Sequence, residues 1–267
     1  MIRPSLFPIL VFLSLLAVAF TACRVDPDED PVVIVTTDPE FSIDLFEQRD
    51  AADGTPTFGL WVESVKKYDC PGYGIDASVS VQNNNIRVTL LGVTPPTPCT
   101  GAPAAAKGFL PIGNLPDGTY GFILSLRDAI VNEGVLTISG GHYSLSLPDQ
   151  QGIDFQNLVM EHIPDGLVWG YAAIPDELSE PVADDFIFNL KTITTEAGLS
   201  PGYYSYFTIS GAGNLMLHKR IEADTVSEPF VRRLTATPDA LQSLLTDYRN
   251  SAQQPLQIGC WTTFGEL

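Results

Sequence analysis

The sequence predicts a mainly β protein, in which an N-terminal two-sheet β-sandwich at residues 38–160 precedes a smaller α+β domain at residues 165–267. Between residues 38 and 148, short runs of alternating apolar and polar side chains recur between turn signals, and this period is typical of half-buried strands. A different pattern begins near Ile163-Pro164-Asp165-Gly166, where one strong helix signal accompanies several short strands. Hydrophobic residues make up 45% of the 267-residue chain, which is enough for a sizeable core.

About eight strands in roughly 110 residues is the spacing expected of a two-sheet sandwich. They are predicted at residues 41–46, 57–66, 75–82, 86–93, 108–112, 119–127, 131–138 and 142–147. The third and fourth are joined by Asn83-Asn84-Asn85, which suits a tight hairpin because asparagine tolerates positive φ. In architecture alone, this region resembles the immunoglobulin-like modules of secreted bacterial proteins.

The C-terminal region is expected to be an antiparallel sheet covered by one amphipathic helix. Strands are predicted at residues 167–173, 185–191, 203–210, 215–219 and 257–264. The helix should begin at Thr237-Pro238-Asp239, which combines an N-cap, a proline in the first turn and an early acidic residue, and should run to about Ser251. Its buried side is predicted to carry Ala240, Leu241, Leu244, Leu245 and Tyr248.

Residues 1–22 have the anatomy of a secretory signal, with Arg3 near the start, an apolar run over residues 6–20 and small residues at the end. The run is short for a helix that must cross roughly 30 Å of hydrocarbon, and a retained membrane anchor is the alternative. Phe20-Thr21-Ala22-Cys23 resembles the lipobox of bacterial lipoproteins, although that family prefers leucine where this chain has phenylalanine. The resemblance implies cleavage before Cys23 and acylation of this cysteine, and two or three acyl chains suffice for stable anchoring.

Residues 23–37 are expected to form an acidic flexible tether. The segment Arg24-Val25-Asp26-Pro27-Asp28-Glu29-Asp30-Pro31 is similar to the export signals of surface lipoproteins of the Bacteroidetes. That resemblance implies a lipid-anchored protein of the cell envelope, on the surface or the periplasmic face of the outer membrane. A spacer without any address is the alternative. Asp224-Thr225-Val226 resembles the O-glycosylation motif of exported proteins of the same group, which implies a glycan on Thr225.

The net charge of −18 restricts the partners of this protein. A surface this acidic repels phosphate backbones and anionic lipid headgroups, so nucleic acid is not an expected partner. Attachment to a membrane must then come from covalent acyl chains rather than from electrostatic attraction. A glycan or another envelope protein is compatible with this charge.

With Cys23 acylated, three cysteines remain in a compartment that permits disulfides. Cys70 and Cys99 lie in Pro- and Gly-rich connections on either side of two predicted strands, and a bridge between them would close a ring of about 30 residues. Cys260 lies in the apolar segment 257–261, which favours a buried inert thiol over a nucleophile.

No complete catalytic, metal or cofactor motif emerges from the sequence. Ser64-Val65-Lys66-Lys67 matches the Ser-x-x-Lys of penicillin-binding proteins, but Ser64 falls in a predicted strand and the partner motifs are absent. The three histidines are far apart and show no metal-ligand spacing. Acidic residues at positions 177, 180, 184 and 185 allow a calcium ion or a carboxylate pair, although a solvated acidic loop is the simpler interpretation.

The aromatic segment 203–207 offers a candidate ligand-binding surface. In a strand, period two places Tyr204 and Tyr206 on one face and their aromatic neighbours on the other, and one of these faces must be core. Outward tyrosines stack on sugar rings or anchor protein partners, unless neighbouring elements cover both faces. Trp169 and Tyr171 share a strand face and allow the same two interpretations.

These features predict a membrane-anchored envelope lipoprotein that acts as a non-catalytic binding or interaction module for a glycan or a protein. One alternative is an envelope hydrolase whose carboxylates come from distant segments. The other is a structural subunit of an envelope complex. Carboxylates about 5 to 10 Å apart in a cleft would favour hydrolysis, whereas an exposed aromatic platform would favour binding.

Overall fold

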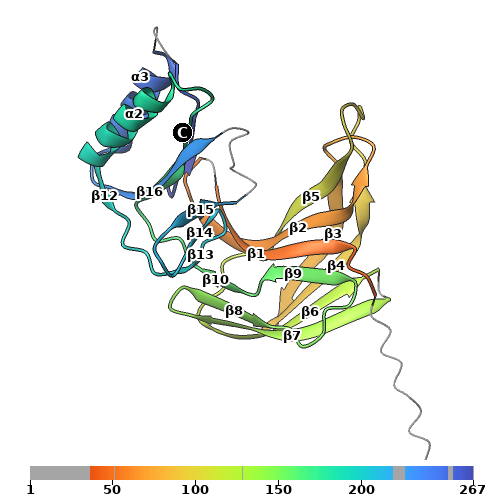
Figure 1. The fold of residues 1–267 in the computed structure, drawn as a ribbon. Helices are drawn as coiled ribbons and strands as arrows, with labels where there is room; N and C mark the ends of the chain where they lie inside the picture. Colours follow the sequence, from red (N-terminus) through yellow and green to blue (C-terminus); the bar gives the residue numbers. More distant parts are fainter. Residues whose placement is uncertain (1–36, 51, 128, 219–225, 252–254, 267) are drawn as a thin grey trace, which may run out of the picture. The chain divides into compact units, whose positions relative to one another are not determined.

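The computed structural model describes residues 37–50, 52–127, 129–218, 226–251 and 255–266, all of which fall within one compact unit, Thr37–Leu267. This part of the chain is mainly β, with four sheets and two helices (Figure 1). It consists of a β-sandwich followed by a smaller α+β part, and the predicted fold class is confirmed.

Two mixed sheets form the sandwich. The four-stranded sheet has the order β5 (Ala104–Pro111), β2 (Pro56–Tyr68), β1 (Phe41–Arg49) and β9 (Ile153–Asn157). The six-stranded sheet has the order β10 (Val159–Glu161), β8 (His142–Ser146), β7 (Ile130–Ser139), β6 (Gly118–Leu126), β4 (Asn85–Thr94) and β3 (Gly74–Gln82). Most neighbouring strands are antiparallel, but β1 pairs in parallel with β9 and β4 in parallel with β6.

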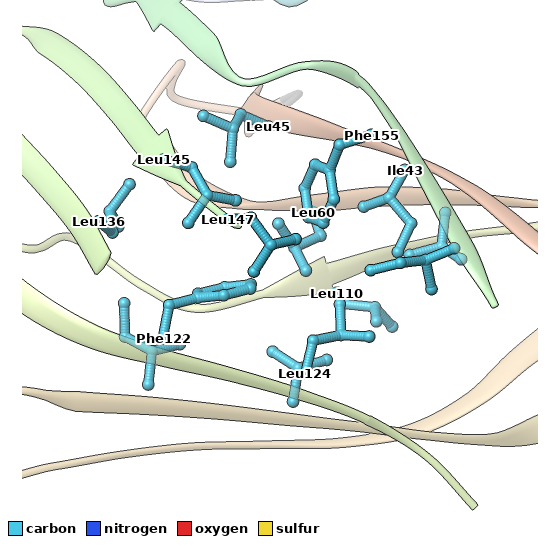
Figure 2. Close-up of a cluster of buried hydrophobic side chains, with 14 of the residues drawn as sticks. Ile43, Leu45, Leu60, Leu110, Phe122, Leu124, Leu136, Leu145, Leu147 and Phe155 are labelled. Carbon is cyan, nitrogen blue, oxygen red and sulfur yellow. The ribbon is translucent and has the colours of Figure 1, made fainter. Parts of the chain in front are cut away.

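The sandwich core is built from alternate residues of both sheets, as period two requires. Figure 2 shows Ile43, Leu45 and Leu60 of the four-stranded sheet facing Phe122 and Leu124 of the six-stranded sheet. Because Ile43 and Leu45 point inward, the side chains that alternate with them along β1 point away from the core. This alternation decides which polar residues of β1 and β2 lie on the outer face of the four-stranded sheet.

All the predicted sandwich strands are present, with shifts of a few residues at their ends. Asn83 and Asn84 both have positive φ, 48° and 59°, and they form the predicted tight turn between β3 and β4. Strands β9 and β10 were not predicted, because each offers only one or two apolar side chains to a period-two pattern. The Cys70–Cys99 disulfide is also confirmed, with a Cα–Cα distance of 5.6 Å.

The C-terminal region has three layers. A five-stranded sheet has the order β12 (Thr194–Glu196), β16 (Ser227–Leu234), β11 (Leu167–Ala173), β17 (Ile258–Thr262) and β18 (Gly265–Glu266). One face of this sheet packs on helices α2 (Glu180–Thr192) and α3 (Pro238–Arg249). The other face packs on a three-stranded sheet with the order β13 (Gly202–Tyr203), β14 (Phe207–Ile209) and β15 (Leu215–Leu217).

The strand predicted at residues 185–191 is wrong, because these residues belong to α2, and the described residues contain two helices instead of one. Phe186, Phe188 and Leu190 alternate as in a strand, but Ala183, Phe186 and Leu190 also share one helical face, and these three are buried. Phe188 lies off this helical face, and it is accordingly 67% exposed. Pro181 in the first turn was the available helix signal.

Helix α3 agrees with its prediction. The Thr237 side chain accepts a hydrogen bond from the Ala240 backbone N–H, as an N-cap does, and Leu241 and Leu245 are buried. The strand predicted at 203–210 is interrupted: residues 204–206 form a turn between β13 and β14, and Ser205 has a φ of 61°. Strand β16 was not predicted, because Pro229 and two arginines obscure its alternation. The division into domains at residues 160–165 stays a prediction.

Replacing both Cys70 and Cys99 by serine is expected to lower the free energy of unfolding by about 3 to 4 kcal/mol, because the bridge spans a sequence separation of 29. Urea unfolding under non-reducing conditions measures the change. As a control, a reductant should lower the midpoint of the wild type and leave that of the double variant unchanged. Equal stabilities of wild type and variant would contradict the prediction.

Candidate functional site

A pocket of about 570 Å³ lies on the outer face of the four-stranded sheet. Its walls include Ser42 and Asp44 of β1 and Trp61 and Glu63 of β2, which alternate with the core residues of the same strands. The remaining lining residues come from β2, β5, β9 and the position directly after β15: Ser64, Val65, Lys107, Gln156, Asn157 and His218. The pocket therefore combines side chains that are far apart in the sequence.

Strand register arranges the polar lining in two neighbouring rows across the sheet. In the first row, Asp44 pairs with Trp61 on one side and with Asn157 on the other. In the second row, Glu63 pairs with Ser42 and Lys107. The Asn157 amide donates a hydrogen bond to Asp44 Oδ1 at 2.8 Å, and Lys107 Nζ lies 3.4 Å from Glu63 Oε1.

Trp61 forms the boundary between this polar pocket and an aromatic cluster. Its ring centroid lies 5.7 Å from that of Phe46, and the Phe46 ring also contacts Tyr206 at 5.0 Å. Tyr206 in turn packs on Trp169, with the ring centroids 5.2 Å apart. The cluster joins the outer face of β1 to the turn between β13 and β14, so one end of the sheet is covered and the other holds the pocket.

A buried charge network lies at the end of the sandwich, on the core side of β1. The Glu47 side chain is 1% exposed, and Arg49 Nε donates to Glu47 Oε1 at 2.9 Å. Nδ1 of His162 lies 2.5 Å from Glu47 Oε2. The Arg49 guanidinium also donates to the Gly54 carbonyl at 3.1 Å and to the Ile163 carbonyl, and Nη1 lies 3.1 Å from Asp165 Oδ1.

Two backbone N–H groups of β1 extend this network to the β13–β14 turn. The N–H of Glu47 donates to Ser205 Oγ at 2.8 Å, and the N–H of Arg49 donates to the Tyr206 hydroxyl at 3.3 Å. Ser205 is fully buried, and its hydroxyl contacts the sulfur of Met160 at 3.1 Å. The network thus connects β1, the segment after β10 and the C-terminal region.

The fixed charges of the network act on two titratable neighbours. The hydrogen bond with Glu47 is the main cause that raises the pKa of His162, against the opposing effect of burial. Burial, followed by the negative charges of Glu47 and Asp117, raises the pKa of Tyr143 to about 12. An imidazolium beside the buried carboxylate is therefore favoured, and the Tyr143 hydroxyl stays neutral.

The predicted outward face of Tyr204 and Tyr206 is wrong, because these residues form a turn and not a strand. Tyr204 is 4% exposed and stacks on Phe207, and Tyr206 is half-buried within the aromatic cluster. Trp169 and Tyr171 are buried in β11. Neighbouring elements therefore cover these four side chains, which was the alternative interpretation of the sequence.

The other sequence candidates have structural roles or lie elsewhere. Ser64 is buried in β2, where its hydroxyl donates to the Lys66 carbonyl and accepts from the Ala106 N–H. Burial raises the pKa of the Cys260 thiol to about 12, in agreement with an inert thiol. Within the described ranges, no group of three or more His, Cys, Asp or Glu side chains is placed to hold a metal ion.

Cys23 and Thr225 lie outside the residues that the structure describes. Among the described residues, no helix has the length and apolar character needed to cross a membrane. No protein-family model, curated protein or solved structure matches this chain.

Sequence reasoning missed both the pocket and the charge network. For the network there was a usable signal, because Glu47 and Arg49 continue the inward period of Ile43 and Leu45, and charged residues at core positions need partners. For the pocket the signal was weaker. Ser42, Asp44, Trp61 and Glu63 are outward in the predicted strands, but only the strand order brings them together.

Arg49→Met is expected to lower the free energy of unfolding by about 3 to 5 kcal/mol, because it leaves the buried Glu47 carboxylate without its arginine partner. Asp165→Asn is the matched control. Its side chain is 88% exposed, so its loss should cost less than about 1 kcal/mol. Urea unfolding of the two variants measures both values, and similar values for both would show that burial of the network is unimportant.

Proposed function

We propose that this protein is a lipid-anchored envelope protein that binds a neutral, hydroxyl-rich ligand, such as a glycan, in the pocket on the four-stranded sheet. The observation that carries the proposal is that the Trp61 side chain and carboxylate, carboxamide and ammonium groups line one cavity of about 570 Å³. Pockets that bind small ligands combine an apolar wall with a few polar groups that fix orientation.

The chemistry of the lining favours a sugar over other ligands. An indole offers a flat apolar face for a sugar ring, and Asp44, Asn157 and Glu63 offer acceptors and donors to hydroxyl groups. The net charge of −18 and two carboxylates in the pocket disfavour an anionic ligand. A neutral glycan fits both observations, and the pocket replaces the tyrosine surface as the proposed binding site.

The membrane attachment in this proposal rests on the leader and on Cys23 in Phe20-Thr21-Ala22-Cys23. The acidic segment 24–31 supports the outer membrane as the location, through its similarity to export signals. Mass spectrometry of the mature protein tests this part of the proposal. An N-terminal Cys23 with acyl chains is expected, and retention of residues 1–22 would contradict it.

A second candidate function is glycan hydrolysis, and one observation favours it. Asp44 and Glu63 line the same pocket, and Asp44 pairs with the residue two positions before Glu63. The Cα atoms of such diagonal neighbours on one sheet face lie about 7 to 8 Å apart, so their side chains can reach the separation of roughly 5 to 9.5 Å between the carboxyl groups of glycosidases. Binding is favoured because Asn157 and Lys107 already engage these carboxylates.

Calorimetric titration of the full-length protein in detergent with neutral hexasaccharides (cello-, xylo-, manno- and malto-) tests the proposed function. At least one should bind, and an oligogalacturonate should not. Asn157→Ala and Lys107→Met should each weaken binding by about tenfold, because each removes a polar group worth roughly 1.4 kcal/mol. Absence of binding by every hexasaccharide would overturn the proposal.

Lys67→Met is the matched control for Lys107→Met, since Lys67 is exposed on β2 and does not line the pocket. It should bind as the wild type does. Chromatography of the titrated sugars separates the two candidate functions. Intact sugars indicate binding alone, whereas shortened products that disappear in Asp44→Asn and Glu63→Gln would establish hydrolysis.

A further inference from the structure

His162 is the partner of the buried Glu47 carboxylate that solvent protons can reach. Its side chain is 36% exposed, while the Glu47 carboxylate that it contacts is 1% exposed. Arg49 occupies the other oxygen of this carboxylate. The buried carboxylate therefore has two cationic partners when His162 is protonated and one when it is neutral.

The same stretch of β1 holds the turn between β13 and β14. The backbone N–H groups of Glu47 and Arg49 donate to the side chains of Ser205 and Tyr206, respectively. Ser205 has a φ of 61°, a conformation that a residue other than glycine keeps only when its surroundings impose it. The contacts with β1 supply part of that constraint, so the turn depends on the position of Glu47.

The turn also positions one wall of the pocket. The backbone N–H of His218 donates to the Tyr206 carbonyl at 2.9 Å, and His218 lines the pocket. On the other side, Tyr206 packs on Phe46, which contacts Trp61. A displacement of the turn would therefore move two walls of the same cavity.

We infer that His162 is a pH-sensitive clasp: in its protonated form it fixes the turn at residues 204–206, and with it the His218 wall of the pocket, to the sandwich. In its neutral form it leaves Arg49 as the one cationic partner of Glu47 and loosens the turn. Control of ligand binding by this clasp rests on the proposed function of the pocket, whereas the clasp itself does not.

The direction of the pH dependence follows from the groups around His162. These groups are Glu47 and Arg49 of β1 and Asp165 of the following loop. Tyr143 of β8 feels the charges of Glu47, Asp117 and Arg49, and its hydroxyl stays neutral over the same pH range. The hydrogen bond with Glu47 raises the pKa of His162 in the folded protein. Its stabilisation is therefore complete below the unfolded pKa of about 6.5 and is lost as the pH rises through the raised folded value.

Amide hydrogen exchange of residues 202–217 in the full-length protein, from about pH 5.5 to about pH 9 and corrected for intrinsic exchange, tests the clasp. In the wild type, protection should fall severalfold as the pH rises. His162→Gln should show the low protection at every pH. His162→Lys, which keeps a positive charge, should retain high protection across the range and also serves if His162→Gln does not fold.

His142→Gln is the control, because His142 pairs with Glu161 and does not contact the Glu47 carboxylate. This variant should keep the wild-type pH profile of protection. A wild-type profile in His162→Gln, or its loss in His142→Gln, would overturn the clasp.

Hexasaccharide titrations at the same pH values distinguish failure of the clasp from failure of the proposed function. Stronger binding at low pH in the wild type, lost in His162→Gln, supports both. If no sugar binds while the exchange profile still follows His162, the clasp stands and the proposed function fails. If a sugar binds with the same pH dependence in wild type and His162→Gln, the proposed function stands and the control of binding by the clasp fails.

Discussion

The buried carboxylate of Glu47 imposes the strongest constraint on this structure. Removing a carboxylate from water costs several kcal/mol unless cations and hydrogen-bond donors replace the solvent, and here Arg49 and His162 provide them. Arg49 is itself buried, so it requires the carbonyl groups of Gly54 and Ile163 as acceptors. The groups that compensate this one charge come from β1, from the connection that contains Gly54 and from residues 162–163, and they meet at the end of the sandwich.

That convergence has a consequence for the outer face of the four-stranded sheet. Where the β13–β14 turn is attached to β1, Tyr206 covers Phe46, and the aromatic cluster excludes water from this end of the face. Farther along the same strands, the polar rows of Asp44 and Glu63 line the pocket. The β13–β14 turn, which the charge network attaches to β1, therefore also bounds the proposed binding site. For this reason protonation of His162 can affect that site.

Much of the fold was predictable because its signals are local. Alternation identifies the sandwich strands, the positive-φ tolerance of asparagine identifies the β3–β4 turn, and Thr237 with Pro238 identifies the start of α3. Local patterns fail where two periods fit the same residues. Residues 186–190 satisfy both a strand and a helix. Pro181 is a local signal for the helix, and packing of α2 against the five-stranded sheet decides in its favour.

The sequence by itself determined eight of the ten sandwich strands in the described residues, the disulfide between two turn-rich connections and the burial of Cys260, since each depends on the character of a short segment. The tertiary structure alone decided the burial of Tyr204 and the union of Asp44, Trp61 and Glu63 with Lys107 and Asn157. It also decided the partners of Glu47. Strand order and register bring these side chains together, and they depend on the packing of many distant segments at once.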